Sequence, residues 1–154
     1  MLKGRFTARY DGEFILFLIG MRLNAWWRID KWLPVFLAMP RMLRELQMNK
    51  SLSFLHSEFW FGRTIILVQY WTSAEQLMAY ANAKDARHLP AWKAFNAAIK
   101  DDSVGIWHET YVIKPGQYEN IYANMPRFGL GAVVEPQEAK GHLARASTRM
   151  TGES

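Results

Sequence analysis

The strongest structural signal in this chain is the apolar run Phe14-Ile15-Leu16-Phe17-Leu18-Ile19-Gly20-Met21. It is short and consists mainly of branched and aromatic residues, so it predicts a β-strand rather than a helix. Two more strands are predicted at 54–61 and 64–71, because the intervening Gly62-Arg63 is a hairpin signal. A fourth strand is predicted at 104–114, where Pro115-Gly116 follows and ends it.

Segments with helical periodicity lie between these predicted strands. Asp30 is a candidate N-cap for a helix to about Met48, in which Pro40 predicts a kink or a split. Ser73 is a candidate N-cap for a second helix to about Lys84, and a third is expected around Pro90. The order β-α-β-β-α(α)-β is the split βαβ, or ferredoxin-like, pattern. We therefore predict an α+β fold with a four-stranded antiparallel sheet and helices on one face.

The length of 154 residues and mass of 17.9 kDa suit one domain with a tail. We place the domain at residues 1–134 and expect the polar segment 135–154 to be a mobile C-terminal tail. Half of the residues are apolar, which excludes disorder for the body of the chain. The absence of cysteine excludes disulfides, thiolate metal sites and a cysteine nucleophile.

The net charge of +5 is spread along the chain without a block of like charges, so a nucleic-acid partner is not expected. The longest apolar run is Phe14–Met21, which is far too short to span a membrane. The residues before it carry several charges and lack the apolar core of a secretory signal. We therefore expect a cytoplasmic protein without a membrane partner.

The predicted strands are apolar on both faces, as in Phe14–Ile19, Phe59-Trp60-Phe61 and Ile65-Ile66-Leu67-Val68. Helices on one side would leave the other face exposed to water. Each large apolar side chain left exposed there would forgo about 1.5–3 kcal/mol of burial free energy. An exposed patch of that kind marks an interaction site. We therefore predict a two-fold homodimer in which sheet faces sheet.

Two groups of polar residues can be sorted by strand alternation. His56 and Glu58 stand two apart and share a face, as two metal ligands, an acid–base pair, or simply a hydrogen-bonded pair. His108 points to the face opposite Trp107, Glu109 and Tyr111, so adjacent His108 and Glu109 cannot chelate one metal. Two ligands are too few for a metal site, and we predict none.

Several segments resemble a family of monooxygenases similar to the fumagillin-biosynthesis monooxygenase. The resemblance runs from about residue 14 to 127 and is carried by Leu33–Met42, Glu58–Thr64, Val68–Trp71, His88–Trp92, Gly105–Tyr111 and Asn124–Arg127. It implies the dimeric α/β-barrel superfamily, which agrees with the dimer argument. It also implies either no cofactor or haem, because relatives include cofactor-independent antibiotic-biosynthesis monooxygenases, haem-degrading monooxygenases and haem-dependent aldoxime dehydratases. If haem is bound, His88 or His108 is the expected axial ligand.

The resemblance leads to a monooxygenase of the antibiotic-biosynthesis type, acting on a small hydrophobic or aromatic substrate. A His or carboxylate would deprotonate the substrate and an arginine would steady its anion. The candidate catalytic residues are His88, His108, Glu58, Tyr70 and Arg22. The candidate substrate-binding residues are Trp71, Trp92, Trp107, Tyr111 and Arg63. The alternatives are a haem-binding barrel protein and a non-catalytic small-molecule-binding protein.

Overall fold

The structure, a computed structural model, describes residues 1–49, 53–83, 96 and 102–151. Its elements follow one another as β1 (Arg5–Thr7), β2 (Phe14–Leu23), α1 (Ile29–Met48), β3 (Phe54–Trp60), β4 (Thr64–Trp71), α2 (Ala74–Asn82), β5 (Val104–Ile113), β6 (Tyr122–Ala123), α4 (Leu130–Val133), β7 (Gln137–Glu138), η3 (Gly141–Ala144) and α5 (Ala146–Thr151). No helix in the described part of the chain has the length and apolar character needed to cross a membrane.

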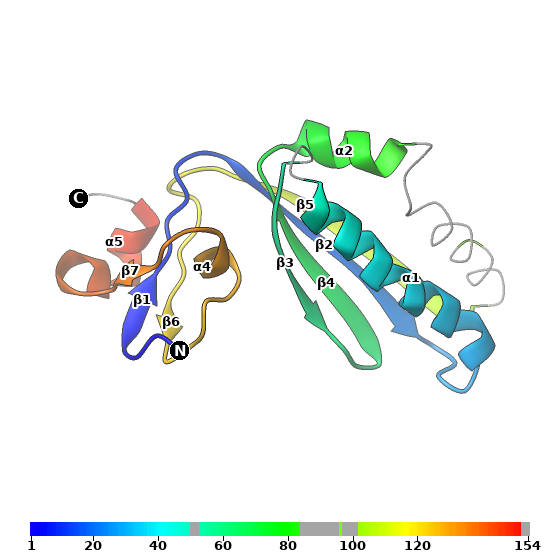
Figure 1. The fold of residues 1–154 in the computed structure, drawn as a ribbon. Helices are drawn as coiled ribbons and strands as arrows, with labels where there is room; N and C mark the ends of the chain where they lie inside the picture. Colours follow the sequence, from blue (N-terminus) through cyan, green and yellow to red (C-terminus); the bar gives the residue numbers. More distant parts are fainter. Residues whose placement is uncertain (50–52, 84–95, 97–101, 152–154) are drawn as a thin grey trace.

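The main sheet has four antiparallel strands in the order β3-β4-β2-β5, and α1 and α2 lie on one of its faces (Figure 1). This order, with its βαββαβ connectivity, confirms the predicted ferredoxin-like fold. β4 has the predicted bounds, whereas β2 continues two residues past the predicted Met21, to Leu23. The predicted helix around Pro90 lies outside the described residues.

The helix starts show which capping predictions hold. At α2 the Ser73 hydroxyl accepts a hydrogen bond from the Gln76 N–H at 3.4 Å, as predicted. At α1 the N-cap is Arg28, and the carboxylate of Asp30 instead accepts two hydrogen bonds from the Arg28 guanidinium at 3.0 Å. α1 also continues through Pro40, so the predicted split is wrong. The proline lies on the exposed side of the helix, where water can satisfy the carbonyl that loses its partner.

The core lies between the main sheet and its two helices. Alternate residues of β4 are buried on this side, which is the pattern of a strand with one face in a core. Trp71 is completely buried, packs on Tyr80 and Phe54, and donates its indole N–H to the Gln69 side chain at 2.9 Å. Since Gln69 is itself buried, this bond satisfies both polar groups.

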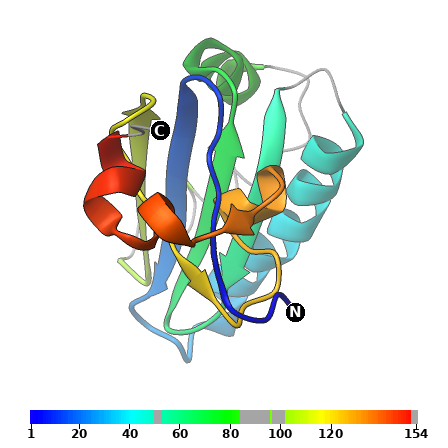
Figure 2. The same cartoon turned by 90° about the vertical axis from the view of Figure 1, so that its left-hand side faces the viewer.

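A second, three-stranded sheet in the order β6-β1-β7 lies on the other side of the main sheet, together with α4 (Figures 1 and 2). Ala8, Phe14 and Leu130 form a small core there, surrounded by tyrosines and valines. The chain therefore covers part of the face that the sequence assigned to a second copy. Residues 120–134 and the N-terminal segment supply this cover. The sequence of residues 127–134 allows a short arm or a fifth strand, and the structure has the helix α4 there instead.

The expected C-terminal tail has structure over much of its length. β7 pairs with β1, and Arg149 of α5 has only 5% of its side chain exposed. Its guanidinium donates to the Glu119 carboxylate at 2.9 Å and to the carbonyls of Leu143 and Ala144 at 2.9 and 3.0 Å. A strand of two residues shows no alternation, so no periodic pattern indicates it. The domain boundary at 134/135 and the mobility of the segment stay predictions.

Gly20 on β2 lets the indole of Trp107, on the neighbouring strand β5, lie against the β2 backbone. A Cβ at this position would lie 2.5 Å from Nε1 of Trp107 and 2.8 Å from the carbonyl oxygen of Ile65. A side chain could move, but the Ile65 carbonyl belongs to the strand ladder and cannot. Glycine is therefore required for the Trp107 indole to lie across β2.

We expect Gly20→Ala to lower the free energy of unfolding by about 1–3 kcal/mol, because the added methyl overpacks the sheet. Chemical denaturation followed by circular dichroism measures this loss. Gly62→Ala is the matched control, since its Cβ would lie 3.7 Å from the nearest atom, and a change within about 0.5 kcal/mol is expected. Equal stabilities of the two variants would contradict the close approach at Gly20.

Candidate functional site

The face of the main sheet that points away from α1 and α2 is called the open face here. Its side chains form three rows across β3, β4, β2 and β5, given by the strand registers. The rows are Trp60–Ile66–Gly20–Trp107, Glu58–Val68–Leu18–Glu109 and His56–Tyr70–Leu16–Tyr111. Polar groups thus stand at the two edges, with an aliphatic floor between them.

Glu58 is the best-connected polar group of the open face. Its Oε1 lies 3.0 Å from Nε2 of His56 and also accepts the backbone N–H of Gly129, at 3.0 Å. The Glu58 side chain is 20% exposed and that of His56 is 31% exposed, so the pair is partly shielded but reachable. The predicted sharing of one face by these two residues is confirmed. In the tautomer that donates from Nε2, the imidazole is oriented by the carboxylate and presents Nδ1 as a base.

Two tyrosines lie beside this pair. Burial, with the nearby Tyr122 and Glu58 adding to it, raises the pKa of Tyr70 to about 12. Burial also raises the pKa of Tyr122, whose hydroxyl accepts the backbone N–H of Gly131 at 3.1 Å. Both phenols therefore stay protonated at neutral pH and can donate a hydrogen bond.

Gly129 brings the α4 backbone close to these phenols. Its φ of +55° is unfavourable for other residues, and a Cβ would lie 3.0 Å from the Tyr70 hydroxyl. The glycine therefore permits the approach that delivers its N–H to Glu58. No sequence signal marked Tyr122 or Gly129, because they belong to a segment without periodicity.

The opposite edge of the open face carries a second acid–phenol pair on β5. The Tyr111 hydroxyl donates a hydrogen bond to the Glu109 carboxylate, which raises the pKa of Tyr111. Both residues are exposed. Three strand spacings separate this edge from β3, or roughly 14 Å. The aliphatic side chains of Leu16, Leu18 and Val68 lie between the two edges.

The structure brings half of the predicted site residues to the open face. These are Arg22, Glu58, Tyr70, Trp107 and Tyr111. Arg63 lies in the exposed β3–β4 turn, and Trp71 and His108 lie on the helix side. His88 and Trp92 lie outside the described residues. The predicted separation of His108 from Trp107, Glu109 and Tyr111 is confirmed.

A haem site would need an imidazole ligand enclosed in an apolar pocket. His108 is exposed, with the Phe17 ring at a centroid distance of 6.0 Å. The described residues thus leave the His108 imidazole open to solvent and do not form a haem site around it. They also contain no group of three or more His, Asp or Glu side chains arranged to hold a metal ion.

A hollow of about 240 Å³ lies away from the open face, between β1, β7, η3 and α5. Arg149 and Glu119 line it, and these two side chains bond to each other. The guanidinium of Arg149 is also held by two backbone carbonyls, so its evident role is to anchor α5. None of the predicted site residues lines this hollow.

Comparisons with known proteins give one family and a set of similar folds. The sequence model of the monooxygenase af470-like family matches residues 14–130. No curated protein matches the sequence. A crystal structure of aldoxime dehydratase is similar with a TM-score of 0.63 and 13% identity, over 97% of this chain and 42% of that chain. A crystal structure of the aldoxime dehydratase OxdRE in complex with butyraldoxime is similar with a TM-score of 0.58 and 16% identity. The match covers 86% of this chain and 37% of that chain.

SnoaB, a cofactor-independent oxygenase from Streptomyces nogalater, is similar with a TM-score of 0.48 and 10% identity, over 66% of this chain and 94% of that chain. At these identities the structural likeness concerns the fold alone. The chain spans less than half the length of either aldoxime dehydratase chain.

We expect Tyr70→Phe to make the protein less sensitive to alkaline pH. A phenol whose pKa is raised to about 12 on folding stabilises the fold below pH 10, and that contribution is lost as the pH rises through 12. Denaturant unfolding at several pH values between 9 and 12 should show a shallower fall in stability for Tyr70→Phe than for wild type. Parallel curves would contradict the raised pKa of Tyr70.

Proposed function

This chain belongs to the monooxygenase af470-like family, and on that premise we propose that it oxygenates a small hydrophobic or aromatic molecule bound on the open face. The family assignment agrees with the predicted class, a monooxygenase-type oxidoreductase. The observation that carries the proposal is the partly shielded His56–Glu58 pair at the edge of an aliphatic floor. An acid–base pair next to an apolar surface suits a substrate that is apolar and must lose a proton.

His56 is the proposed general base. Glu58 accepts the Nε2–H of His56 and also accepts the N–H of Gly129. The carboxylate therefore fixes the orientation of the His56 imidazole on the side opposite Nδ1. Nδ1 then takes a proton from a carbon next to the aromatic system of the substrate. Glu58 stabilises the imidazolium that forms, since a carboxylate beside a cationic ring lowers its energy.

Tyr70 is proposed to stabilise the substrate anion. It adjoins His56 in the same row of the open face, with ring centroids 6.5 Å apart. Since its raised pKa keeps it a neutral phenol, its O–H can donate to an enolate or phenolate oxygen. Trp60 stands one row beyond Glu58 on the same strand and offers aromatic contact to a flat substrate.

The proposed reaction needs no electrons from the protein. A substrate CH₂ group flanked by aromatic rings loses one proton, and the carbanion transfers electrons to O₂ and forms a C–O bond. The resulting hydroperoxide loses the second C–H proton while its O–O bond breaks. The balance is CH₂ plus O₂ giving C=O plus H₂O, so the substrate supplies all of the electrons.

We expect His56→Ala to slow oxygen uptake by about 10²–10⁴-fold, the range for loss of a general base. Glu58→Gln should have a smaller effect, because it removes orientation and charge but leaves the base. An oxygen electrode measures the rates, with anthrone and dithranol as probes because each has a CH₂ group between two aromatic rings, and with non-enzymatic oxidation subtracted.

His108→Ala is the matched control for this experiment, because that histidine lies on the helix side and should keep the wild-type rate. Equal loss in His56→Ala and His108→Ala would argue against the open face. A wild-type protein that leaves uptake of both probes unchanged would contradict the proposed substrate class. A Soret band in the purified protein would contradict the cofactor-independent form of the proposal.

We also propose that the protein is a homodimer through the part of the open face over β2 and β5. Leu16, Leu18 and Trp107 remain half-buried there and Tyr111 is 47% exposed. Contact with a second copy would remove this apolar surface from water. This chain matches 42% of an aldoxime dehydratase chain, so two copies of this chain together have about the length of one such chain.

Sedimentation equilibrium at micromolar concentration should give twice the chain mass of 17.9 kDa. Leu18→Glu places a charge in the centre of the proposed contact and should shift the equilibrium towards the monomer, because the charge would lose its water. Thr110→Glu on the same sheet but on the helix side is the control and should stay dimeric. A wild-type mass of one chain would refute the dimer.

A further inference from the structure

The turn between β2 and α1 holds two tryptophans out in solvent. Trp26 and Trp27 are 63% and 64% exposed, and their rings meet edge to face at 6.2 Å. The turn is tied to the body of the protein, because the N–H groups of Asn24 and Ala25 both donate to the carbonyl of Ser103 at 3.1 and 3.0 Å. Rings that are exposed on a fixed turn are available for contact with another surface.

The β3–β4 turn lies next to this one. The N–H of Leu23 donates to the carbonyl of Arg63 at 2.9 Å, and the Phe61 ring is 66% exposed. Ile29, at the start of α1, is 53% exposed. We call these four exposed apolar side chains the aromatic tip: Trp26, Trp27, Ile29 and Phe61.

The aromatic tip is supported from within. Trp32 donates its indole N–H to the carbonyl of Trp26 at 2.9 Å, and Phe36 packs on Phe61 with ring centroids 5.4 Å apart. Phe36 also contacts Trp32 at 6.4 Å. These half-buried partners connect the two turns, so the four side chains project together from one end of the molecule.

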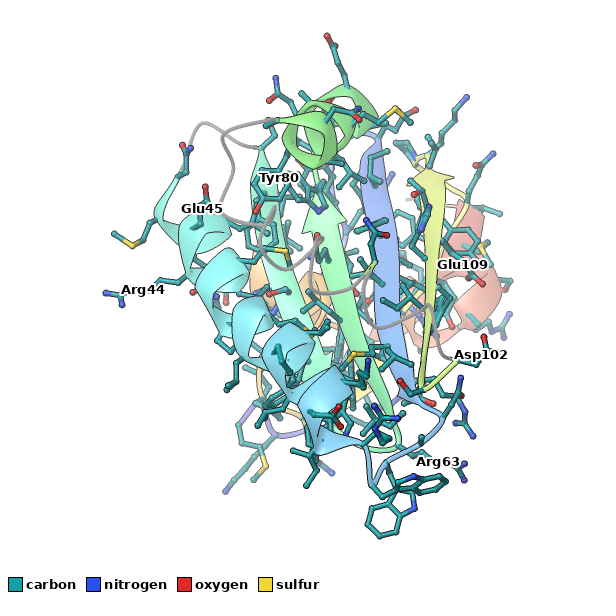
Figure 3. All side chains as sticks on the ribbon, turned by 90° about the vertical axis from the view of Figure 1, so that its right-hand side faces the viewer. Arg44, Glu45, Arg63, Tyr80, Asp102 and Glu109 are labelled. Carbon is teal, nitrogen blue, oxygen red and sulfur yellow. The ribbon has the colours of Figure 1, made fainter. Side chains whose placement is uncertain are left out.

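Basic residues surround the aromatic tip. Four of them lie in the turns or in the adjoining ends of β2 and α1: Arg22, Arg28, Lys31 and Arg63. The described carboxylates at this end are Asp30, which is paired with Arg28, and Asp102, which precedes β5 (Figure 3). Among the described residues, cationic side chains therefore outnumber carboxylates at this end, in line with the net charge of +5.

We propose that the aromatic tip docks this protein on an anionic lipid surface. Tryptophan is suited to the membrane interface, because its ring is apolar while its N–H can bond to headgroups and water. Cationic side chains around inserted aromatic rings add attraction to anionic lipids. The rings are exposed on two turns at one end of the molecule, which fits a deformable surface better than a rigid protein partner.

This departs from the expectation of no membrane partner, which rested on the lack of a spanning segment. Docking at the surface needs no such segment. It is also independent of the proposed oxygenation, because no residue of the aromatic tip belongs to the His56–Glu58 site.

The test is co-sedimentation with vesicles of phosphatidylcholine alone or with an equal part of phosphatidylglycerol. Wild type should bind the anionic vesicles, bind the neutral ones more weakly, and lose binding as salt is raised. The double variant Trp26→Ala/Trp27→Ala should bind with a partition coefficient lower by about tenfold or more. Met78→Ala is the control, since Met78 is 61% exposed on α2, at the other end of the sheet, and should bind as wild type does.

Binding of the double variant at the wild-type level, or no binding of wild type to anionic vesicles, would overturn the proposal. Sedimentation equilibrium of the same variants without lipid gives a second readout, in which an unchanged mass is expected. A double variant that dissociates into single chains would overturn the proposal in another way, because it would make the aromatic tip a contact between copies of this chain.

Discussion

A sheet with apolar side chains on both faces must be covered on both faces, and this constraint shapes the whole molecule. α1 and α2 cover one face, where Ile15, Ile65, Leu67 and Trp71 are completely buried. On the other face, α4 contacts β3, and the small core of Ala8, Phe14 and Leu130 packs on Tyr70 of β4 and Ile113 of β5 (Figure 2). Each large side chain moved out of water there contributes about 1.5–3 kcal/mol, which explains why two segments distant in sequence fold over it.

The same cover creates the polar site. Because α4 lies against β3 and β4, it shields Glu58 and Tyr70 from bulk water. The desolvation of these polar groups costs free energy, which hydrogen bonds must offset. The Gly129 N–H bonds to Glu58, and the Gly131 N–H bonds to Tyr122. Residues 129–131 thus keep the shielded groups satisfied and fix their positions. Fixed donors and acceptors next to an apolar floor suit the proposed deprotonation of an apolar molecule.

Sequence reasoning succeeded where the periodicity was long and failed where it was short. β2, β4 and β5 each carry eight to ten residues of strand pattern, so both their existence and their facing were predictable. β6 and β7 have two residues each, and α4 has four, so they left no pattern to detect. The contact of Glu58 with Gly129 joins residues 71 positions apart, and no local rule indicates it. The sequence could therefore predict His56 and Glu58 as a pair, but not the backbone that completes their site.

The two carboxylates of the middle row differ in how firmly they are held, and this assigns them different roles. Glu58 is 20% exposed and bonded to both an imidazole and a backbone amide, so its position is fixed by two elements. Glu109 is exposed and bonded to Tyr111 on its own strand, so a single element holds this pair. A group that orients a base must keep its geometry, whereas a group at the rim can adapt to different molecules. The fixed edge at β3 is therefore the side where proton transfer is proposed, and the exposed edge at β5 is the side proposed to meet a second copy.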